Sequence, residues 1–331
     1  MRALMYIALI LSSLGSNAQS PYRIVSAQAM PYTDPTYFLG LDEEMVVAVQ
    51  YQGQFFESNS AQFKTLGLFS NYAYAHTESD IFGVQMNVLT ENDLHGYQLT
   101  QVLAGLSYKK LLSPPRSIFQ HAVAVGFQIG LNNFRLAFEE LWFSSQFDQS
   151  LTQVQMDWDS GEQFVNAGNF NDTYWPINGG IQYQLEKKRS WGLKALFSVN
   201  QINEPVARID VANFRVNRNY LGHVEFKLFP SKEFASKLWT TFSSQANSNI
   251  LQTGIQANLN SNSNGEDWEV GLGLFSNFTS RLEQSSLIQL GVGINLEWMN
   301  YGIHLRYLQP ITAQYNVGGS LQIGLSYFPF R

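Results

Sequence analysis

The sequence predicts an all-β transmembrane protein, an outer-membrane β-barrel of fourteen antiparallel strands. The main observation is a recurring stretch of about ten residues in which apolar and small polar residues alternate. Side chains of a strand point to opposite faces with a period of two residues. The last stretch has an apolar face of Leu321, Ile323, Leu325 and Tyr327 and a small polar face of Gln322, Gly324 and Ser326. A polar face without long charged side chains is typical of a barrel lumen, with the apolar face against lipid.

The composition agrees with a membrane barrel. Charged residues make up 14% of the chain, whereas soluble domains carry roughly 25%. Aromatic residues also make up 14%, and barrels need few charges against lipid and aromatic girdles at both interfaces. The net charge of −6 argues against nucleic acid as a partner, because binding it requires a basic surface. The absence of cysteine excludes disulfides and thiolate metal sites, and we expect no cofactor.

Residues 1–18 have the features of a secretory signal peptide. Arg2 supplies the positive start, residues 3–14 are apolar, and Ser16-Asn17-Ala18 is a small-x-small cleavage site. A transmembrane anchor is the alternative, but about twelve apolar residues are too few to span ~30 Å as a helix. We therefore expect a signal peptide over 1–18 with cleavage near Ala18, a periplasmic or lumenal segment over 19–44, and the barrel over 45–331.

Fourteen strands are predicted, with twelve or sixteen as alternative counts. An even count puts both ends of a single-chain bacterial barrel on one side of the membrane. The connections after every second strand are all short, as periplasmic turns are, whereas two others, at 131–176 and 200–218, are long like extracellular loops. The predicted strands lie near 45–55, 63–74, 81–89, 97–110, 118–130, 177–186, 190–199, 219–229, 236–243, 250–260, 266–277, 284–296, 300–308 and 317–328.

Aromatic residues gather near the ends of these strands, where interfacial girdles would place them. The alternative is a set of ordinary core aromatics in a soluble β-protein. The predicted girdle positions are Tyr51, Phe55, Tyr72, Tyr108, Trp191, Trp239, Trp268, Trp298, Tyr301 and Tyr307.

Two groups of ionisable residues share predicted inward faces. His223, Glu225 and Lys227 alternate along one strand, and His304 and Arg306 alternate along another. They form either a polar relay or substrate site, or a charge network that satisfies and fills the barrel interior. We favour the charge network.

No catalytic motif is present in the sequence, which lacks G-x-S-x-G, H-E-x-x-H, Walker A and G-x-G-x-x-G patterns. We therefore expect no enzymatic activity. The remaining enzymatic alternative is an outer-membrane lipid or ester hydrolase in which His223 or His304 acts as the base.

The connection at 131–176 is the candidate partner-binding segment. It is too long for a passive turn, and it is rich in the aromatic residues that anchor protein interfaces. The alternative is a loop that folds inward as a plug or packs over the barrel mouth. The residues that we expect to contact a partner are Trp142, Phe143, Phe147, Asp148 and Trp158.

Several short motifs occur in a characteristic order along the chain. They are Asp34-Pro35-Thr36, a strand ending in Gly126-Phe127-Gln128-Ile129-Gly130, then Leu141-Trp142-Phe143, Gln146-Phe147-Asp148, and Gly318-Gly319 before the last strand. In this order the chain resembles the PorP/SprF family, outer-membrane proteins associated with type IX secretion in Bacteroidota. It departs from the family's usual Asn-Pro-Ala at Asp34-Pro35-Thr36, and from an acidic residue often seen in the last strand at Gln322.

The resemblance implies a non-enzymatic barrel that supports secretion and surface attachment of adhesins, including gliding adhesins. The implied partners are the adhesin C-terminal domain and periplasmic ring or motor components, with outer-membrane lipid around the barrel. The alternative function is an outer-membrane porin or transporter for small solutes, and the hydrolase ranks below both.

Overall fold

The computed structural model describes most of the expected barrel. It covers residues 45–56, 61–93, 97–114, 117–137, 169–188, 190–209, 212–229, 231, 233–245, 248–263, 266–281, 284–311 and 317–329. The expected signal peptide and the segment 19–44 lie outside these ranges. Within them, no helix is long and apolar enough to cross a membrane.

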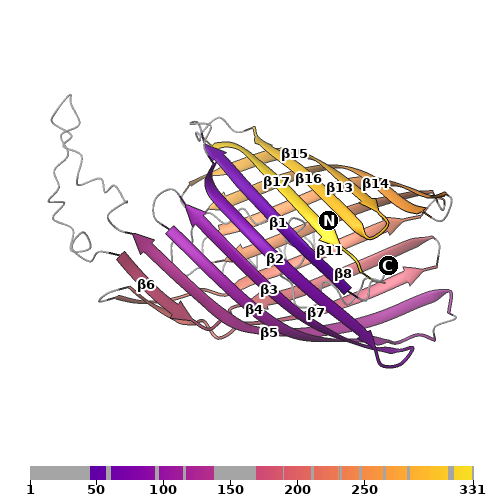
Figure 1. Cartoon of the computed structure of the whole chain (residues 1–331), viewed down its shortest axis with the longest axis horizontal. Coiled ribbons are helices and arrows are strands. Elements are labelled where there is room, and N and C mark those ends of the chain that lie inside the picture. The colour runs from indigo at the N-terminus through magenta and orange to yellow at the C-terminus, as the bar shows by residue number, and fades with distance from the viewer. Residues whose placement is uncertain are drawn as a thin grey trace, which may run out of the picture.

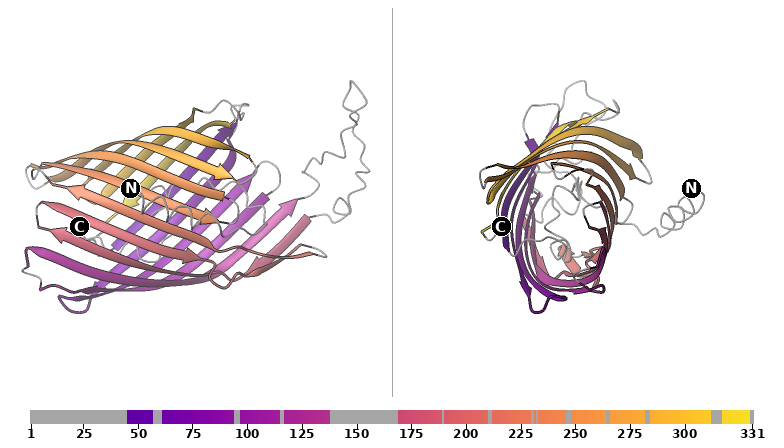
Figure 2. Two further views of the ribbon diagram at one scale, coloured as in Figure 1. Left: turned by 180° about the vertical axis from the view of Figure 1, so that it is seen from behind. Right: turned by 90° about the vertical axis from the view of Figure 1, so that its right-hand side faces the viewer.

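Fourteen antiparallel strands form a closed barrel (Figures 1 and 2). Each strand pairs with its neighbours in chain order, and the ring closes where the first strand pairs with the last, from Val47 opposite Tyr327 to Gly53 opposite Leu321. The strands are β1 (Met45–Phe56), β2 (Ala61–Ala75), β3 (Asp80–Asp93), β4 (Tyr97–Leu111), β5 (Phe119–Ala137), β7 (Ile177–Lys187), β8 (Trp191–Asn200), β11 (Asn219–Leu228), β12 (Phe234–Gln245), β13 (Ser248–Ser263), β14 (Glu266–Arg281), β15 (Gln284–Trp298), β16 (Tyr301–Pro310) and β17 (Val317–Tyr327).

The predicted fold class and the count of fourteen strands are confirmed. Both predicted long connections nevertheless contain strand residues. The connection at 131–176 is shortened because β5 continues to Ala137, and β6 (Asn169–Tyr174) pairs with that extension. The connection at 200–218 contains a separate hairpin of β9 (Val206–Ile209) and β10 (Ala212–Arg215). A strand continues wherever its backbone finds a partner strand. The alternation of apolar and polar residues does not reveal where such a partner lies.

The two ends of the barrel differ. At one end, named here the turn end, β1 begins, β17 ends and every connection is a short turn. At the opposite end, named the loop end, β5 ends at Ala137 and the β9–β10 hairpin follows β8. In an outer-membrane barrel the turn end faces the periplasm and the loop end faces outward.

The side chains of each strand alternate between a buried lumen face and an exposed outer face. On β11, His223 and Glu225 are each 5% exposed, whereas Val224 between them is 49% exposed. The same parity puts Gln, Asn, Ser and Gly inside, and Leu, Ile, Val and Phe outside, around the ring. An outer surface of exposed aliphatic residues is stable only against lipid, because water would be in contact with a continuous apolar band.

An aromatic girdle surrounds the turn end. Outward-facing Tyr72, Tyr108, Trp191, Trp268, Trp298 and Tyr301 lie close to the turns, as predicted. The prediction is wrong for Trp239, which is only 2% exposed and lies inside the barrel. Trp239 occupies an odd-numbered position of β12, on the same face as Lys237 and Thr241, and the strand parity therefore directs it into the lumen. The side chain of Phe55 lies outside the described part of the chain.

We expect the substitution Leu274→Arg to destabilise the barrel by about 2–4 kcal/mol, because it puts a charge into the apolar band near the middle of a spanning strand. Leu274 is 62% exposed and lies near the centre of β14. The measurement is the free energy of unfolding of the lipid-embedded barrel in urea, in which the folded fraction is read from the gel mobility of the folded barrel. The control is Leu274→Val, and equal stability of the arginine and valine variants would contradict a lipid-facing position.

Candidate functional site

The five residues that we expected to bind a partner, Trp142, Phe143, Phe147, Asp148 and Trp158, lie outside the described residues. The described candidates all lie on the wall of the lumen. They form two groups, and the structure shows how the groups are placed relative to each other.

The first group surrounds the carboxylate of Glu225 on β11. Lys227 Nζ lies 3.5 Å from Glu225 Oε1, and Lys237 Nζ from β12 lies 3.6 Å from Glu225 Oε2. The alternation of β11 brings Glu225 and Lys227 to one face, and the register places Lys227 opposite Lys237 and Glu225 opposite Lys194. His223 lies one step towards the loop end, with Nδ1 2.8 Å from Thr241 Oγ1.

Sequence reasoning missed Lys237 and Lys194 in this group. Both lie on inward positions of strands that were predicted, but their proximity to Glu225 depends on the register between strands. A one-residue slip would move each lysine to the lipid face. The available signal was chemical: a charge in the middle of a spanning strand is tolerated only on the lumen side.

The second group lies on β16. His304 Nδ1 is 3.1 Å from Asn295 Oδ1 of β15, and the guanidinium of Arg306 lies over the ring of Phe275, 5.8 Å from its centroid. Across the sheet, four ladder steps lead from Lys237 through Gln256, Gly273 and Gly293 to Arg306. Since neighbouring strands are about 4.8 Å apart, the two groups are separated by roughly 19 Å along the wall. The predicted residues therefore form two local clusters on the wall.

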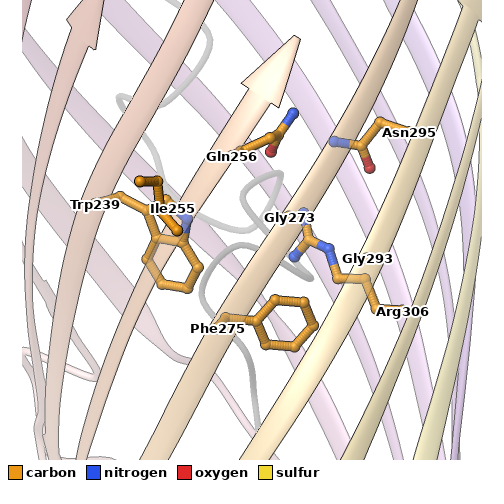
Figure 3. A pocket seen from close by; sticks show the side chains of 8 residues that line it. All are labelled: Trp239, Ile255, Gln256, Gly273, Phe275, Gly293, Asn295 and Arg306. Atoms are coloured by element: carbon orange, nitrogen blue, oxygen red, sulfur yellow. The ribbon is translucent and has the colours of Figure 1, made fainter.

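A pocket lies on the wall between the two groups (Figure 3). Its floor is the directly paired Gly273 and Gly293, and its cavity volume is about 10 Å³, roughly the room that one water molecule needs. The lining residues are Trp239, Ile255, Gln256, Gly273, Phe275, Gly293, Asn295 and Arg306. The two aromatic rings, the guanidinium and the two amide groups project around the glycine floor (Figure 3). Rings and amides are groups that contact a flat, hydrogen-bonding solute, and a solute larger than water would enter only if these side chains moved apart.

Glycines on the neighbouring strands make room for the aromatic walls of the pocket. A Cβ at Gly254 would lie 2.5 Å from the indole of Trp239, so the ring lies directly over this glycine. A Cβ at Gly291 would collide in the same way with the ring of Phe275. At Gly273 the nearest atom to such a Cβ is 3.5 Å away. Gly273 therefore has room for a methyl group, whereas Gly254 and Gly291 have none.

The hairpin β9–β10 joins β8 to β11 at the loop end, and Ala207 of β9 is fully buried. The chain turns towards the hairpin at Gln201 and Glu204, whose φ angles of 59° and 43° are unusual for residues other than glycine.

A set of polar contacts fastens the hairpin to the barrel. Asn178 Oδ1 accepts a hydrogen bond of 3.0 Å from the backbone N–H of Gln201, and Gln245 Nε2 donates one of 3.2 Å to Gln201 Oε1. Arg218 Nε donates to the carbonyl of Ile202 at 3.1 Å and lies 3.4 Å from Glu204 Oε1. We name Gln201, Glu204 and Arg218 the clasp.

The hydrolase alternative requires a serine beside one of the histidines. The structure places Ser326 Oγ 3.4 Å from His304 Nε2, so that Ser326, His304 and Asn295 form a chain of polar contacts. The hydroxyl is buried, at 5% exposure, and Glu297 lies two ladder steps away at the same level of the wall. A nearby carboxylate disfavours the oxyanion of ester hydrolysis.

We therefore expect Ser326 to remain unlabelled by a fluorophosphonate, the reagent that reacts with activated serines. The measurement is intact-mass analysis of the protein in detergent and in lipid. A secreted serine esterase treated in parallel is the positive control. Labelling that disappears in both Ser326→Ala and His304→Ala would contradict the expectation of no enzymatic activity.

Among the residues that the structure describes, no group of three His, Asp or Glu side chains could hold a metal ion.

Comparisons with known proteins bear on the fold. No family model matches the sequence, and no curated protein matches it. Among solved structures, the chain is similar to the CymD monoaromatic hydrocarbon channel, with a TM-score of 0.54, 9% identity, and 94% of each chain covered. It is also similar to the Pseudomonas putida toluene transporter TodX, with a TM-score of 0.50, 11% identity and 94% of each chain covered. A TodX deltaS2S3 mutant gives a TM-score of 0.52 at 11% identity over 96% of each chain. The chain has the fold of outer-membrane barrel proteins.

Proposed function

We propose that this chain works in the outer membrane as a gated channel or transporter for small solutes. The observation that carries the proposal is the polar lumen with its aromatic and glycine-lined pocket. The recess between Trp239, Phe275 and Arg306 has room for about one water molecule, so a solute would enter it only in an open state of the barrel. The lumen wall is packed, since Gln289 and Gln128 are fully buried, so transport requires an opening step.

The nature of the solute follows from the lining of the pocket. Two aromatic rings favour a flat ring, and the amides of Gln256 and Asn295 favour a hydrogen-bonding substituent. CymD and TodX are named as a monoaromatic hydrocarbon channel and a toluene transporter, and their names support a small ring-bearing solute here. The test is uptake of toluene and of benzyl alcohol into proteoliposomes. Uptake no faster than in empty vesicles, also after release of the clasp, would refute the channel.

Loosening the clasp is expected to open the barrel. The substitution Arg218→Ala removes the bond to the Ile202 carbonyl and the contact with Glu204. The ion pair is part-exposed and contributes little, and a charged hydrogen bond contributes about 1.5 kcal/mol at the low end of its range. That difference corresponds to about a tenfold change in an equilibrium, so we expect about tenfold more open time in planar bilayers. Lys188→Ala, at an exposed turn, is the control, and unchanged conductance of Arg218→Ala would argue against a gating hairpin.

A second candidate function is supported by a different observation, the order of the short motifs from Asp34-Pro35-Thr36 to Gly318-Gly319. Under this proposal the chain belongs to the PorP/SprF type and supports type IX secretion by binding the C-terminal domain of an adhesin at the loop end. Periplasmic ring or motor components would bind at the turn end. A packed lumen is compatible with this role, because an anchor for a partner needs no open pore.

One experiment separates the two candidates. Tagged protein is purified from native membranes in mild detergent, and the proteins that accompany it are identified. Recovery of a large secreted protein, or of ring and motor components, supports the secretion role. A variant lacking residues 140–166, which keeps β6, should then lose the adhesin while retaining the folded barrel. Recovery of the barrel alone supports the channel.

A further inference from the structure

Buried side-chain atoms that lack hydrogen-bond partners occur on most strands of the lumen wall, and five of them belong to amide groups in one sector. The sector consists of β17, β1, β2 and β3, which are consecutive neighbours in the sheet. Its five amide side chains are 3–6% exposed. One atom of each amide has no hydrogen-bond partner among the residues that the structure describes. These atoms are Gln322 Nε2, Gln50 Oε1, Asn71 Nδ2, Gln85 Nε2 and Asn87 Nδ2.

These amides point into the lumen and form one patch. Asn71 and Gln85 are directly opposite each other in the ladder between β2 and β3. The residues that alternate with the amides, such as Val49 and Met86, are exposed on the lipid face. The unpaired atoms therefore lie on the inner surface of the barrel, and we name this surface the amide patch.

A covered amide without a partner is unfavourable, because it has lost its hydrogen bonds to water and gained none in return. Five such groups on one surface indicate that the surface is complementary to something that forms hydrogen bonds. An apolar solute or a lipid chain would leave all five unpaired. The unpaired atoms include N–H donors and a carbonyl acceptor, and each amide carries both kinds of group, so a matching occupant offers carbonyl oxygens and N–H groups along its length.

We propose that the amide patch binds an extended polypeptide, and that the occupant is the segment 19–44 of this chain. This segment joins the barrel at Met45, the first residue of β1 at the turn end. Asn71 is the ladder partner of Val46, and Gln85 is the partner of Asn71. The patch therefore begins one ladder step from the point where the segment joins the barrel.

Length and composition fit the segment to the patch. Its 26 residues, Gln19 to Glu44, extend to about 86 Å at ~3.3 Å per residue, and a twelve-residue strand such as β1 rises about 40 Å. The segment can therefore turn back into the barrel and reach every amide of the patch. It contains Pro21, Pro31 and Pro35, each of which keeps its carbonyl but has no N–H. An extended backbone thus offers carbonyl acceptors throughout and N–H donors at the other positions, so it is able to pair with either end of each amide.

The absence of cysteine from the chain allows a direct test by cross-linking of the full-length protein in native membranes. One cysteine replaces Asn87 on the patch, and the second replaces Ala27, Ala29 or Thr36 in turn. We expect at least one pair to form an intrachain disulfide after mild oxidation. The matched controls carry the cysteine at Met86, on the lipid face of the same strand, and should form none. No cross-link in any of the Asn87 pairs would overturn the proposal.

A second measurement identifies other occupants. The Asn87→Cys variant is treated with a water-soluble maleimide, with and without residues 20–40. We expect at least tenfold faster labelling after the deletion, with the barrel still heat-modifiable on gels. Equal rates would show that water alone covers the patch and would overturn the proposal. A disulfide between Asn87→Cys and Ser145→Cys, with none to the N-terminal cysteines, would also overturn the proposal. It would identify the 138–168 connection as the occupant of the amide patch. Neither measurement depends on conductance, so the outcome is independent of the proposed channel.

Discussion

Replacement of Glu225 by alanine is expected to destabilise the barrel by about 3 kcal/mol. Glu225 is the counter-charge of two ammonium groups, those of Lys227 at 3.5 Å and Lys237 at 3.6 Å. Its removal leaves like charges close together on a wall with little access to water, and the loss of one partner from a buried ion pair costs about 3–5 kcal/mol. We expect a cost at the lower end of this range because the Lys227 side chain is 43% exposed and is able to turn towards solvent. The measurement is the urea midpoint of the barrel in lipid.

A compensated variant separates charge from packing. Glu225→Gln combined with Lys237→Met removes one charge of each sign and keeps the volumes similar. We expect it to recover most of the lost stability, because replacing a buried pair by neutral groups is often tolerated. Val224→Ala, on the lipid face of the same strand, serves as the positional control. If Glu225→Ala and Val224→Ala unfold at the same urea concentration, the lysines do not depend on Glu225.

The substitution Gly130→Ala is also expected to have a large effect, a loss of about 3 kcal/mol at the upper end of the usual range for overpacking. A Cβ at this position would collide with the carbonyl oxygen of Val102 and would lie 3.0 Å from the Cα of Leu103. Both are backbone atoms of β4, so no side chain is able to move aside. The N–H of Gly130 also donates a hydrogen bond of 3.2 Å to the carbonyl of Pro176, which lies between β6 and β7. The clash should therefore loosen the β6 extension at the loop end as well.

The matched control for this substitution is Gly222→Ala on β11. A Cβ there would meet no atom within 4 Å, and alanine in a strand avoids the entropic penalty of glycine, about 0.5–1 kcal/mol. We expect the control to be neutral or slightly stabilising in the same urea titration. A Gly130→Ala barrel as stable as the control would mean that β4 and β5 lie farther apart than the structure shows.

The two groups of predicted lumen residues show how far sequence reasoning reaches. Strand parity put His223, Glu225 and Lys227 on one face, because alternation is a property of each strand by itself. It did not show that Lys237 completes the group, or that Arg306 stands roughly 19 Å from it beside Phe275. Those relations depend on the pairing between strands, and a slip of one residue reverses every face. The pocket could not be predicted for the same reason, since it exists only where Gly273 and Gly293 pair with each other.

Trp239 illustrates the limit for individual residues. Proximity to a strand end suggested an interfacial position, but the parity shared with Lys237 and Thr241 directs the indole inward, over Gly254. Parity is the stronger rule, because a strand is unable to rotate one side chain to its opposite face. The same alternation, applied to Trp239 before its distance from the strand end, would have placed it correctly.

The sequence by itself determined the class of the fold, the number of strands and the face of the lumen residues, since period-two alternation with a small polar inner face is stable only as a closed barrel in lipid. Only the tertiary structure decided which residues meet across strands: the contact of Lys237 with Glu225, the glycine floor, the clasp at Gln201 and the amide patch. The physical reason is that alternation is local, whereas register is set by the closure of all fourteen strands together.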